Sequence, residues 1–164
     1  VNLSGRQFTQ SNLMKDVQNI ISQSALPARF IDLEITESLA MSDAERNINI
    51  LKGLKALGIA LSIDDFGTGY SSLAYLHSFP IDTIKIDRSF VLNLDNQEGQ
   101  AIARTILATA ESLNLEVVAE GIELDDQLDF FQGKHCDIFQ GYKFGKPMPA
   151  NEFIEWLSKK TSNE

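Results

Sequence analysis

The sequence contains a single cysteine, Cys136, among its 164 residues, so it cannot form a disulfide within the chain. This scarcity is typical of proteins from a reducing compartment. Positive charge is also scarce, since 14 Lys and Arg stand against 23 Asp and Glu, for a net charge of −9. Such a balance excludes the basic surface that duplex nucleic acid requires. No apolar run approaches the ~20 residues that span a bilayer, so we expect no membrane segment within the chain.

What is present is the composition of a globular protein, with 43% hydrophobic and 23% charged residues. The length suits one domain, and no low-complexity tract or block of charge divides residues 1–164. The chain begins with Val1 rather than Met, inside an apolar run. We therefore expect the chain to be a portion of a larger domain. We expect this domain to lie in the cytoplasm, whether or not the parent protein is anchored to a membrane.

Short apolar runs rich in β-branched residues alternate with longer segments of helical periodicity. The runs are mostly continuous rather than alternating, which is typical of strands buried on both faces of a parallel sheet. The expected strands are Val1–Leu3, Phe30–Thr36, Ile59–Asp64, Ile81–Ile86, Leu115–Ala119 and Asp137–Gln140.

Two of the intervening segments carry clear helix signals. Ser42 and Glu45 have the spacing of a capping box at a helix start, and Gly58 marks a helix end. The apolar stripes that we expect to face the core are Ile48, Leu51, Leu54 and Leu57 in one segment and Ile102, Ile106, Ala110 and Leu113 in the other.

Six strand–helix repeats predict an α/β protein with a parallel sheet, either doubly wound and open or closed into a barrel. A complete (β/α)8 barrel takes about 250 residues. Six units in 164 residues therefore favour a TIM-like barrel that is truncated on its N-terminal side.

Each expected strand ends on polar or charged residues. Because the carboxyl ends of parallel strands share one face of the sheet, we expect these side chains to lie together and form a site. Any single carboxylate there is equally well explained as a helix cap, but six consecutive strand ends are not. The residues are Asn2, Glu34, Glu37, Asp64, Asp65, Lys85, Asp87, Glu120, Glu123 and Gln140.

Crowded carboxylates repel one another unless a cation compensates them. Ligands that are all oxygen favour Mg²⁺ or Mn²⁺ over Zn²⁺, which prefers His and Cys. His77 and His135 lie away from the strand ends and lack ligand spacing. The adjacent pair Asp64 and Asp65 suits two ions, the arrangement that clamps both oxygens in phosphodiester hydrolysis. Lys85 is placed to hold a water molecule or to stabilise phosphoryl charge.

The glycine-containing loop after Asp65 is not a dinucleotide fingerprint. Ser72 stands where G-x-G-x-x-G needs its third glycine, and the two preceding Asp residues would repel a pyrophosphate. We interpret residues 66–72 as a mobile loop beside the metal site.

The ordered motifs of this chain resemble the EAL domain of bacterial cyclic di-GMP phosphodiesterases, and the resemblance covers almost the whole chain. It implies a (β/α)8 barrel that uses two Mg²⁺ or Mn²⁺ ions to cut cyclic di-GMP to linear pGpG. The motifs are Val-Asn-Leu-Ser-Gly-Arg-Gln-Phe at 1–8, Glu-Ile-Thr-Glu at 34–37, Asp-Asp-Phe-Gly-Thr-Gly-Tyr-Ser-Ser-Leu at 64–73, Lys-Ile-Asp at 85–87, Ala-Glu-Gly-Ile-Glu at 119–123, Gln-Gly-Tyr at 140–142 and Lys-Pro-Met-Pro at 146–149.

The resemblance also implies roles for individual residues. Lys85, Glu120 and Gln140 match catalytic positions, where the lysine holds a water molecule and the glutamate acts as ligand or general base. Glu37 matches a glutamate that anchors the Asp-Asp-Phe-Gly loop and links the metal site to dimerisation. The implied metal ligands are Asn2, Glu34, Asp64, Asp65 and Glu120, and the implied substrate or loop positions are Glu37, Asp87, Glu123, Arg6 and Tyr142.

The glutamate that names the family lies upstream of Val1, so we expect residues 1–164 to be the C-terminal part of an EAL domain. The expected partners are cyclic di-GMP, a second copy in a homodimer, and upstream sensory or GGDEF-type domains in the parent. One alternative is an inactive EAL-like module that binds cyclic di-GMP or a protein. A phosphoacceptor domain is a weaker one, because such a fold needs a further Asp on an intervening strand, and Lys85 already lies on the strand directly after the Asp pair.

Overall fold

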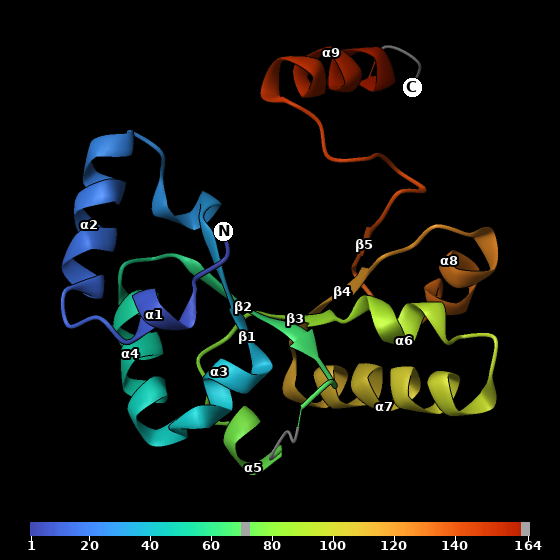
Figure 1. The fold of residues 1–164 in the computed structure, drawn as a ribbon, viewed down its shortest axis with the longest axis horizontal. Coiled ribbons are helices and arrows are strands. Elements are labelled where there is room, and N and C mark those ends of the chain that lie inside the picture. Colours follow the sequence, from blue (N-terminus) through green and yellow to red (C-terminus); the bar gives the residue numbers. More distant parts are fainter. Residues whose placement is uncertain (70–72, 162–164) are drawn as a thin grey trace.

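The computed structural model describes residues 1–69 and 73–161, so Tyr70, Ser71 and Ser72 of the glycine-containing motif lie outside the described residues. Its strands form one parallel sheet in the order β1-β2-β3-β4-β5, which is also their order along the chain (Figure 1). A doubly wound sheet reverses its strand order at a switch point, and this one does not. The strands are β1 (Asp32–Thr36), β2 (Ala60–Phe66), β3 (Thr83–Ile86), β4 (Glu116–Glu120) and β5 (Ile138–Gln140).

The predicted α/β architecture is thus confirmed, but Val1–Leu3 is not a full strand. Asn2 makes an isolated parallel bridge to Glu34, with the Leu3 amide donating to the Glu34 carbonyl at 2.8 Å. Ser4 then caps the helix α1 (Gly5–Phe8), which ends the extended segment after one bridging residue.

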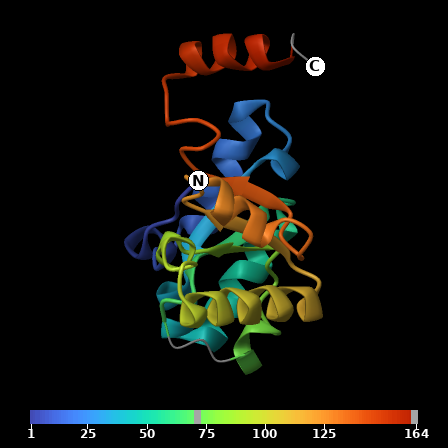
Figure 2. The ribbon, with the colours of Figure 1, turned by 90° about the vertical axis from the view of Figure 1, so that its right-hand side faces the viewer.

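Helices connect successive strands and cover the sheet. Figure 2 shows that the last helix, α9, stands away from the sheet at the end of an extended segment. The remaining elements are α2 (Leu13–Ser24), the 3-10 turn η1 (Ala28–Phe30), α3 (Glu37–Ser42), α4 (Ala44–Ala56), α5 (Leu73–Leu76), α6 (Arg88–Leu92), α7 (Gln97–Leu113), α8 (Asp125–Phe131) and α9 (Ala150–Thr161). Among the helices within the described ranges, none has both the length and the hydropathy to cross a membrane.

The strands alternate between apolar and polar residues, contrary to the expectation of continuous apolar runs, although β3 is buried on both faces as expected. In β3, Ile84 and Ile86 alternate with Thr83 and Lys85. Successive side chains point to opposite faces of a sheet, so one face is apolar and the other is largely polar. The apolar face supplies the core with Leu33, Ile35, Leu61, Ile63, Ile84, Ile86, Val117 and Ala119, all less than 9% exposed. The polar face carries the side chains that matter for the site.

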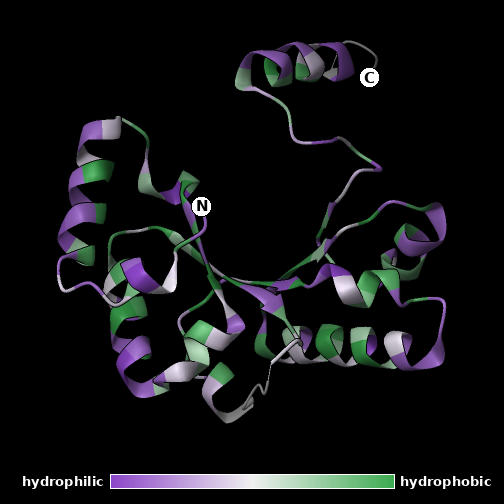
Figure 3. Ribbon diagram, viewed as in Figure 1, coloured by the Kyte–Doolittle hydropathy of each residue, from purple (hydrophilic) through white to green (hydrophobic). Residues whose placement is uncertain are grey.

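The long helices are amphipathic, and Figure 3 shows both apolar and hydrophilic residues on α2, α4 and α7. In α4 the predicted residues Leu51 and Leu54 are fully buried, and Gly58 follows the helix with φ +84°. In α7 the buried residues are Gly99, Ala103, Ile106, Leu107 and Ala110. The predicted stripe is wrong at its first position, because the helix turns Ile102 toward solvent at 36% exposure.

The predicted capping box at Ser42 and Glu45 is also wrong. Ser42 is the last residue of α3, where its hydroxyl donates to the Leu39 carbonyl at 2.8 Å. Asp43 therefore precedes α4, although its side chain makes no capping hydrogen bond. The prediction fails because α3 ends immediately before α4 and includes Ser42 as its last residue, so Ser42 cannot cap α4.

Cys136 lies two residues before β5 and is half-buried, with its thiol directed at the Val117 and Ile138 carbonyls. Burial raises the pKa of the Cys136 thiol to about 12. Because only the thiolate reacts, we expect iodoacetamide at pH 8 to alkylate the folded protein about a thousandfold more slowly than the urea-unfolded chain. Equal rates in the two states would contradict this environment for Cys136.

Candidate active site at the carboxyl ends of the strands

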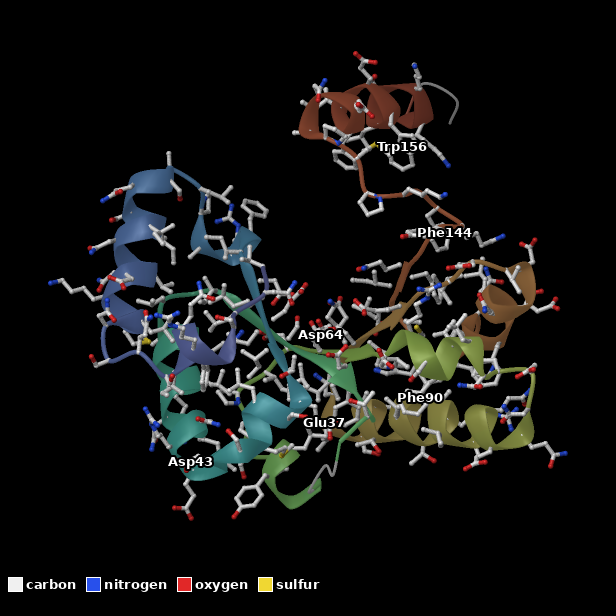
Figure 4. All side chains as sticks on the ribbon, in the orientation of Figure 1. Glu37, Asp43, Asp64, Phe90, Phe144 and Trp156 are labelled. Atoms are coloured by element: carbon white, nitrogen blue, oxygen red, sulfur yellow. The ribbon has the colours of Figure 1, made fainter. Side chains whose placement is uncertain are left out.

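Three carboxylates from three strands converge on one buried ammonium group. Lys85, on the central strand β3, lies 2.7 Å from Glu120, 3.3 Å from Glu34 and 3.3 Å from Asp64, measured from Nζ to carboxylate oxygens. The Lys85 side chain is only 8% exposed. Figure 4 shows Asp64 near the middle of the sheet, where these strands meet. Four of the residues selected at strand ends thus form one cluster.

The electrostatics of this cluster keep Lys85 protonated. Burial opposes the charged form of Lys85, but the hydrogen bond and charge of Glu120 act the other way. The negative charges of Asp64 and Glu34 add to Glu120, and together they raise the pKa of Lys85 above its ordinary value. Lys85 can therefore donate hydrogen bonds but cannot serve as a base near neutral pH.

Glu120 has the opposite balance. Burial raises the pKa of the Glu120 carboxyl, and the hydrogen bond and positive charge of Lys85 only partly offset this effect. The nearby charges of Asp64 and Glu34 raise it further. A carboxylate with a raised pKa, at 2.7 Å from a donor, is suited to accept a proton during a reaction.

An irregularity in β2 separates the side chain of Asp65 from that of Asp64. The register with β3 shifts between Ile63 and Phe66, and Asp65 has a left-handed backbone with φ 54°. The Asp65 amide donates to Asp64 Oδ1 at 3.1 Å, while the Asp65 side chain is exposed. Partial desolvation and the charges of Asp64 and Asp87 raise the pKa of Asp65. The adjacent carboxylates therefore point to separate positions, with Asp64 inside the cluster and Asp65 at its margin.

Glu37 contacts the loop that follows β2. It is the first residue of α3 and 1% exposed, and its Oε2 accepts from the Gly67 amide at 2.7 Å and from Gly69 at 3.3 Å. A Cβ at Gly69 would lie 2.9 Å from Glu37 Oε1, so any other residue there would require the Glu37 carboxylate to shift. Figure 4 places Glu37 below Asp64, on the side of the loop.

We expect Glu37→Gln to loosen this loop while the fold remains intact. A neutral amide retains one acceptor oxygen but loses the charge that strengthens both bonds, a difference of about 1 kcal/mol. Hydrogen exchange measured by NMR should show faster exchange at the Gly67 and Gly69 amides. Glu98→Gln, on an exposed glutamate in the first turn of α7, is the matched control and should leave both amides unchanged. Unchanged protection in Glu37→Gln would mean that other contacts hold the loop.

Gln140 and Glu123 lie beside the cluster, around a pocket of about 200 Å³. Gln140 ends β5 and pairs in register with Glu120 on β4, so the two side chains share a face. Tyr142 is 54% exposed and lies under the Lys146 ammonium, 5.3 Å from its ring centre. The pocket is lined by Arg88, Glu120, Gly121, Glu123, Gln140, Gly141 and Tyr142.

The other predicted residues have different surroundings. Asn2 is exposed and reaches the site through its bridge to Glu34. Asp87 caps α6, accepting from the amide and the hydroxyl of Ser89. Arg6 is exposed on α1 and makes no ion pair with a carboxylate in the described part of the chain.

The chemistry of the cluster fits a divalent cation. Its donors are carboxylate oxygens, which Mg²⁺ and Mn²⁺ prefer. Glu34, Asp64 and Glu120 carry three negative charges against one on Lys85, so one divalent ion would balance the remainder. Across residues 1–69 and 73–161, no three His, Cys, Asp or Glu side chains already form a metal-holding group, because these carboxylates turn toward Lys85.

Sequence reasoning missed Arg88 and Gln127. Arg88 Nη2 donates to Glu123 Oε1 at 2.7 Å, and Gln127 Oε1 accepts from the Glu123 and Leu124 amides. Gln127 lies three residues after Leu124, the residue that precedes α8. This spacing is typical of a glutamine that caps a helix start, so it was a signal in the sequence. Nothing local distinguishes Arg88 from other surface arginines.

The chain is similar to known proteins along most of its length. The EAL domain family matches residues 1–147. The cyclic di-GMP phosphodiesterase NbdA of Pseudomonas aeruginosa is 43% identical over 96% of this chain, which covers 20% of NbdA. The bifunctional diguanylate cyclase/cyclic di-GMP phosphodiesterase MucR of the same organism is 43% identical over 94% of this chain and 23% of MucR. The chain thus spans about a fifth of the length of these relatives.

Solved structures agree with these similarities. The structure of PaMucR phosphodiesterase in complex with c-di-GMP superposes with a TM-score of 0.91 at 44% identity, covering 93% of this chain and 62% of that one. The EAL domain of Mycobacterium smegmatis DcpA gives 0.89 at 38% identity, covering 96% and 71%. The chain belongs to the EAL domain family.

Proposed function

We propose that this chain is the C-terminal part of an EAL domain that hydrolyses cyclic di-GMP to linear pGpG. The observation that carries the proposal is the convergence of Glu34, Asp64 and Glu120 on Lys85 at the strand ends. Its support is the similarity to two relatives named as cyclic di-GMP phosphodiesterases, and to a neighbour whose structure contains c-di-GMP.

In the proposed reaction, a water oxygen forms a bond to one phosphorus of the cyclic dinucleotide, and the bond from that phosphorus to O3′ breaks. The water loses one proton, and the leaving O3′ gains one, so the product has a 5′-phosphate and a free 3′-hydroxyl. Lys85 is protonated, so it orients the water or stabilises the charge on the phosphoryl oxygens. Glu120, hydrogen-bonded to Lys85, is the proposed acceptor of the proton.

The proposed cations are two Mg²⁺ or Mn²⁺ ions. When bound, they polarise the phosphodiester and lower the pKa of the attacking water. The residues proposed to hold them are Asn2, Glu34, Asp64, Asp65 and Glu120, all of which offer oxygen ligands. Gln140 is proposed to order the adjacent water, and Glu37 to hold the loop after Asp65. The positions proposed to shape substrate binding are Arg6, Asp87, Glu123 and Tyr142.

The parent protein is proposed to be a cytoplasmic homodimer, or a membrane-anchored protein with this domain in the cytoplasm. Sensory or GGDEF-type domains are proposed to precede the EAL domain. The name of MucR, which joins a diguanylate cyclase with a phosphodiesterase, supports such a combination.

The test is chromatographic detection of pGpG from cyclic di-GMP with Mn²⁺, for this chain and for the parent protein that carries it. Turnover by the parent supports the proposal, and turnover by this chain as well would mean that its own ligands suffice. Binding of cyclic di-GMP without turnover by either protein would favour an EAL-like binding module instead.

A further inference from the structure

The pair between Arg88 and Glu123 is held at both ends by features that a surface ion pair does not need. The side chains are 54% and 36% exposed, and exposed pairs alone contribute little to stability. Gln127, which is 7% exposed, fixes the Glu123 backbone by accepting from its amide at 2.8 Å. The Glu123 end of the pair is therefore built into the start of α8.

The Arg88 end is fixed by Gly121. This glycine has φ +76°, and a Cβ placed there would lie 2.2 Å from Arg88 Cγ and 2.9 Å from its Cβ and Cδ. The aliphatic stem of Arg88 thus lies directly on the Gly121 backbone, which directs the guanidinium toward Glu123. A side chain at position 121 would displace Arg88.

Both members of the pair line the pocket that Glu120 and Gln140 also line. Glu120 is the residue that bonds Lys85 at 2.7 Å, so the pocket adjoins the proposed reaction centre. Two carboxylates in one pocket repel an anionic ligand unless a cation compensates them. Arg88 supplies that charge to Glu123 without removing its second oxygen, Oε2, as an acceptor.

We propose that Arg88 is a positioning residue for substrate binding, acting through Glu123. Arg88 neutralises and orients the Glu123 carboxylate, so that a free carboxylate oxygen faces the N–H donors of a bound nucleotide. This inference rests on the proposed function, because it requires a cyclic dinucleotide in the adjoining site. Arg88 contacts Glu123 rather than the reacting atoms, so its loss affects binding and leaves the chemical step unchanged.

The experiment is a double-mutant cycle of Arg88→Gln and Glu123→Gln in the parent protein, with KM and kcat measured for cyclic di-GMP. Each single variant should raise KM about tenfold and leave kcat within about twofold. The double variant should also raise KM about tenfold rather than a hundredfold, because both changes remove the same interaction. Arg88→Lys keeps the charge and should restore most of the affinity. Arg46→Gln, on an exposed arginine of α4, is the matched control and should change neither constant.

The failure of this inference differs from the failure of the proposed function. Independent, multiplicative effects of the two substitutions, or a fall in kcat alone, would overturn the role of Arg88 while turnover itself persists. If the wild type binds cyclic di-GMP without hydrolysing it, Kd is measured for the same four proteins in place of KM. Single and double variants with equally weakened binding then support the inference, and multiplicative effects overturn it. A wild type that neither binds nor hydrolyses cyclic di-GMP overturns both.

Discussion

Asp64→Asn is expected to reduce pGpG formation by at least about a hundredfold in the parent protein. The substitution keeps the shape of the side chain but replaces one of the three carboxylates around Lys85 with a neutral amide. A carboxylate that would hold the proposed cations is thereby lost, so calorimetric titration with Mn²⁺ should show weaker binding.

The matched control for this variant is Asp129→Asn, which makes the same change on an exposed residue of α8. It should leave both turnover and Mn²⁺ binding unaltered. Near-normal turnover in Asp64→Asn would contradict the assignment of Asp64 as a metal ligand, whatever the behaviour of the control.

Lys85→Met should destabilise the metal-free protein by about 3–5 kcal/mol and abolish turnover. Methionine fills a similar volume but leaves Glu34, Asp64 and Glu120 without a counter-charge in a site where Lys85 is only 8% exposed. Urea unfolding, monitored by circular dichroism in the presence of a chelator, measures the loss. Added Mn²⁺ should restore part of the stability, since it compensates the same charges.

Lys55→Met provides the comparison for this effect. Lys55 pairs with Asp82, and both side chains are more than a third exposed, so this change should cost within about 1 kcal/mol. A loss for Lys85→Met as small as that for Lys55→Met would show that the carboxylate cluster does not depend on Lys85.

The position of the site was predictable from the sequence, because parallel strands bring their carboxyl ends to one face. Glu120 ends its strand, and Glu34, Asp64 and Lys85 lie within one or two residues of the ends of theirs. The structure brings all four side chains together. The alternation of the strands was harder to detect. In a strand of four residues such as Thr83–Ile86, a continuous apolar run and an alternating apolar–polar pattern differ at only two positions, so the sequence distinguishes them poorly.

Features that depend on how neighbouring elements form and pack were not predictable. The start of α4 depends on whether a preceding helix already uses Ser42, and the exposure of Ile102 depends on how α7 rotates against the sheet. The role of Arg88 depends on Gly121, which belongs to a different strand–helix unit. The neighbours that decide the environments of Ile102 and Arg88 lie outside any short window of sequence, whereas Ser42 is decided by the helix that it ends, which the capping pattern alone does not reveal.

Neighbouring residues of one strand point to opposite faces of the sheet and therefore have different roles. Ile84 and Ile86 on the apolar face are fully buried, whereas Lys85 between them belongs to the carboxylate cluster. Folding depends on the buried isoleucines, whereas the proposed hydrolysis depends on the lysine and on its charge balance with the three carboxylates. A lineage that abandons hydrolysis is therefore expected to change Lys85 together with its carboxylate partners, so that their charges stay balanced, while it preserves the residues on either side. Loss of activity in this architecture would appear as isolated substitutions along conserved strands rather than as decay of whole segments.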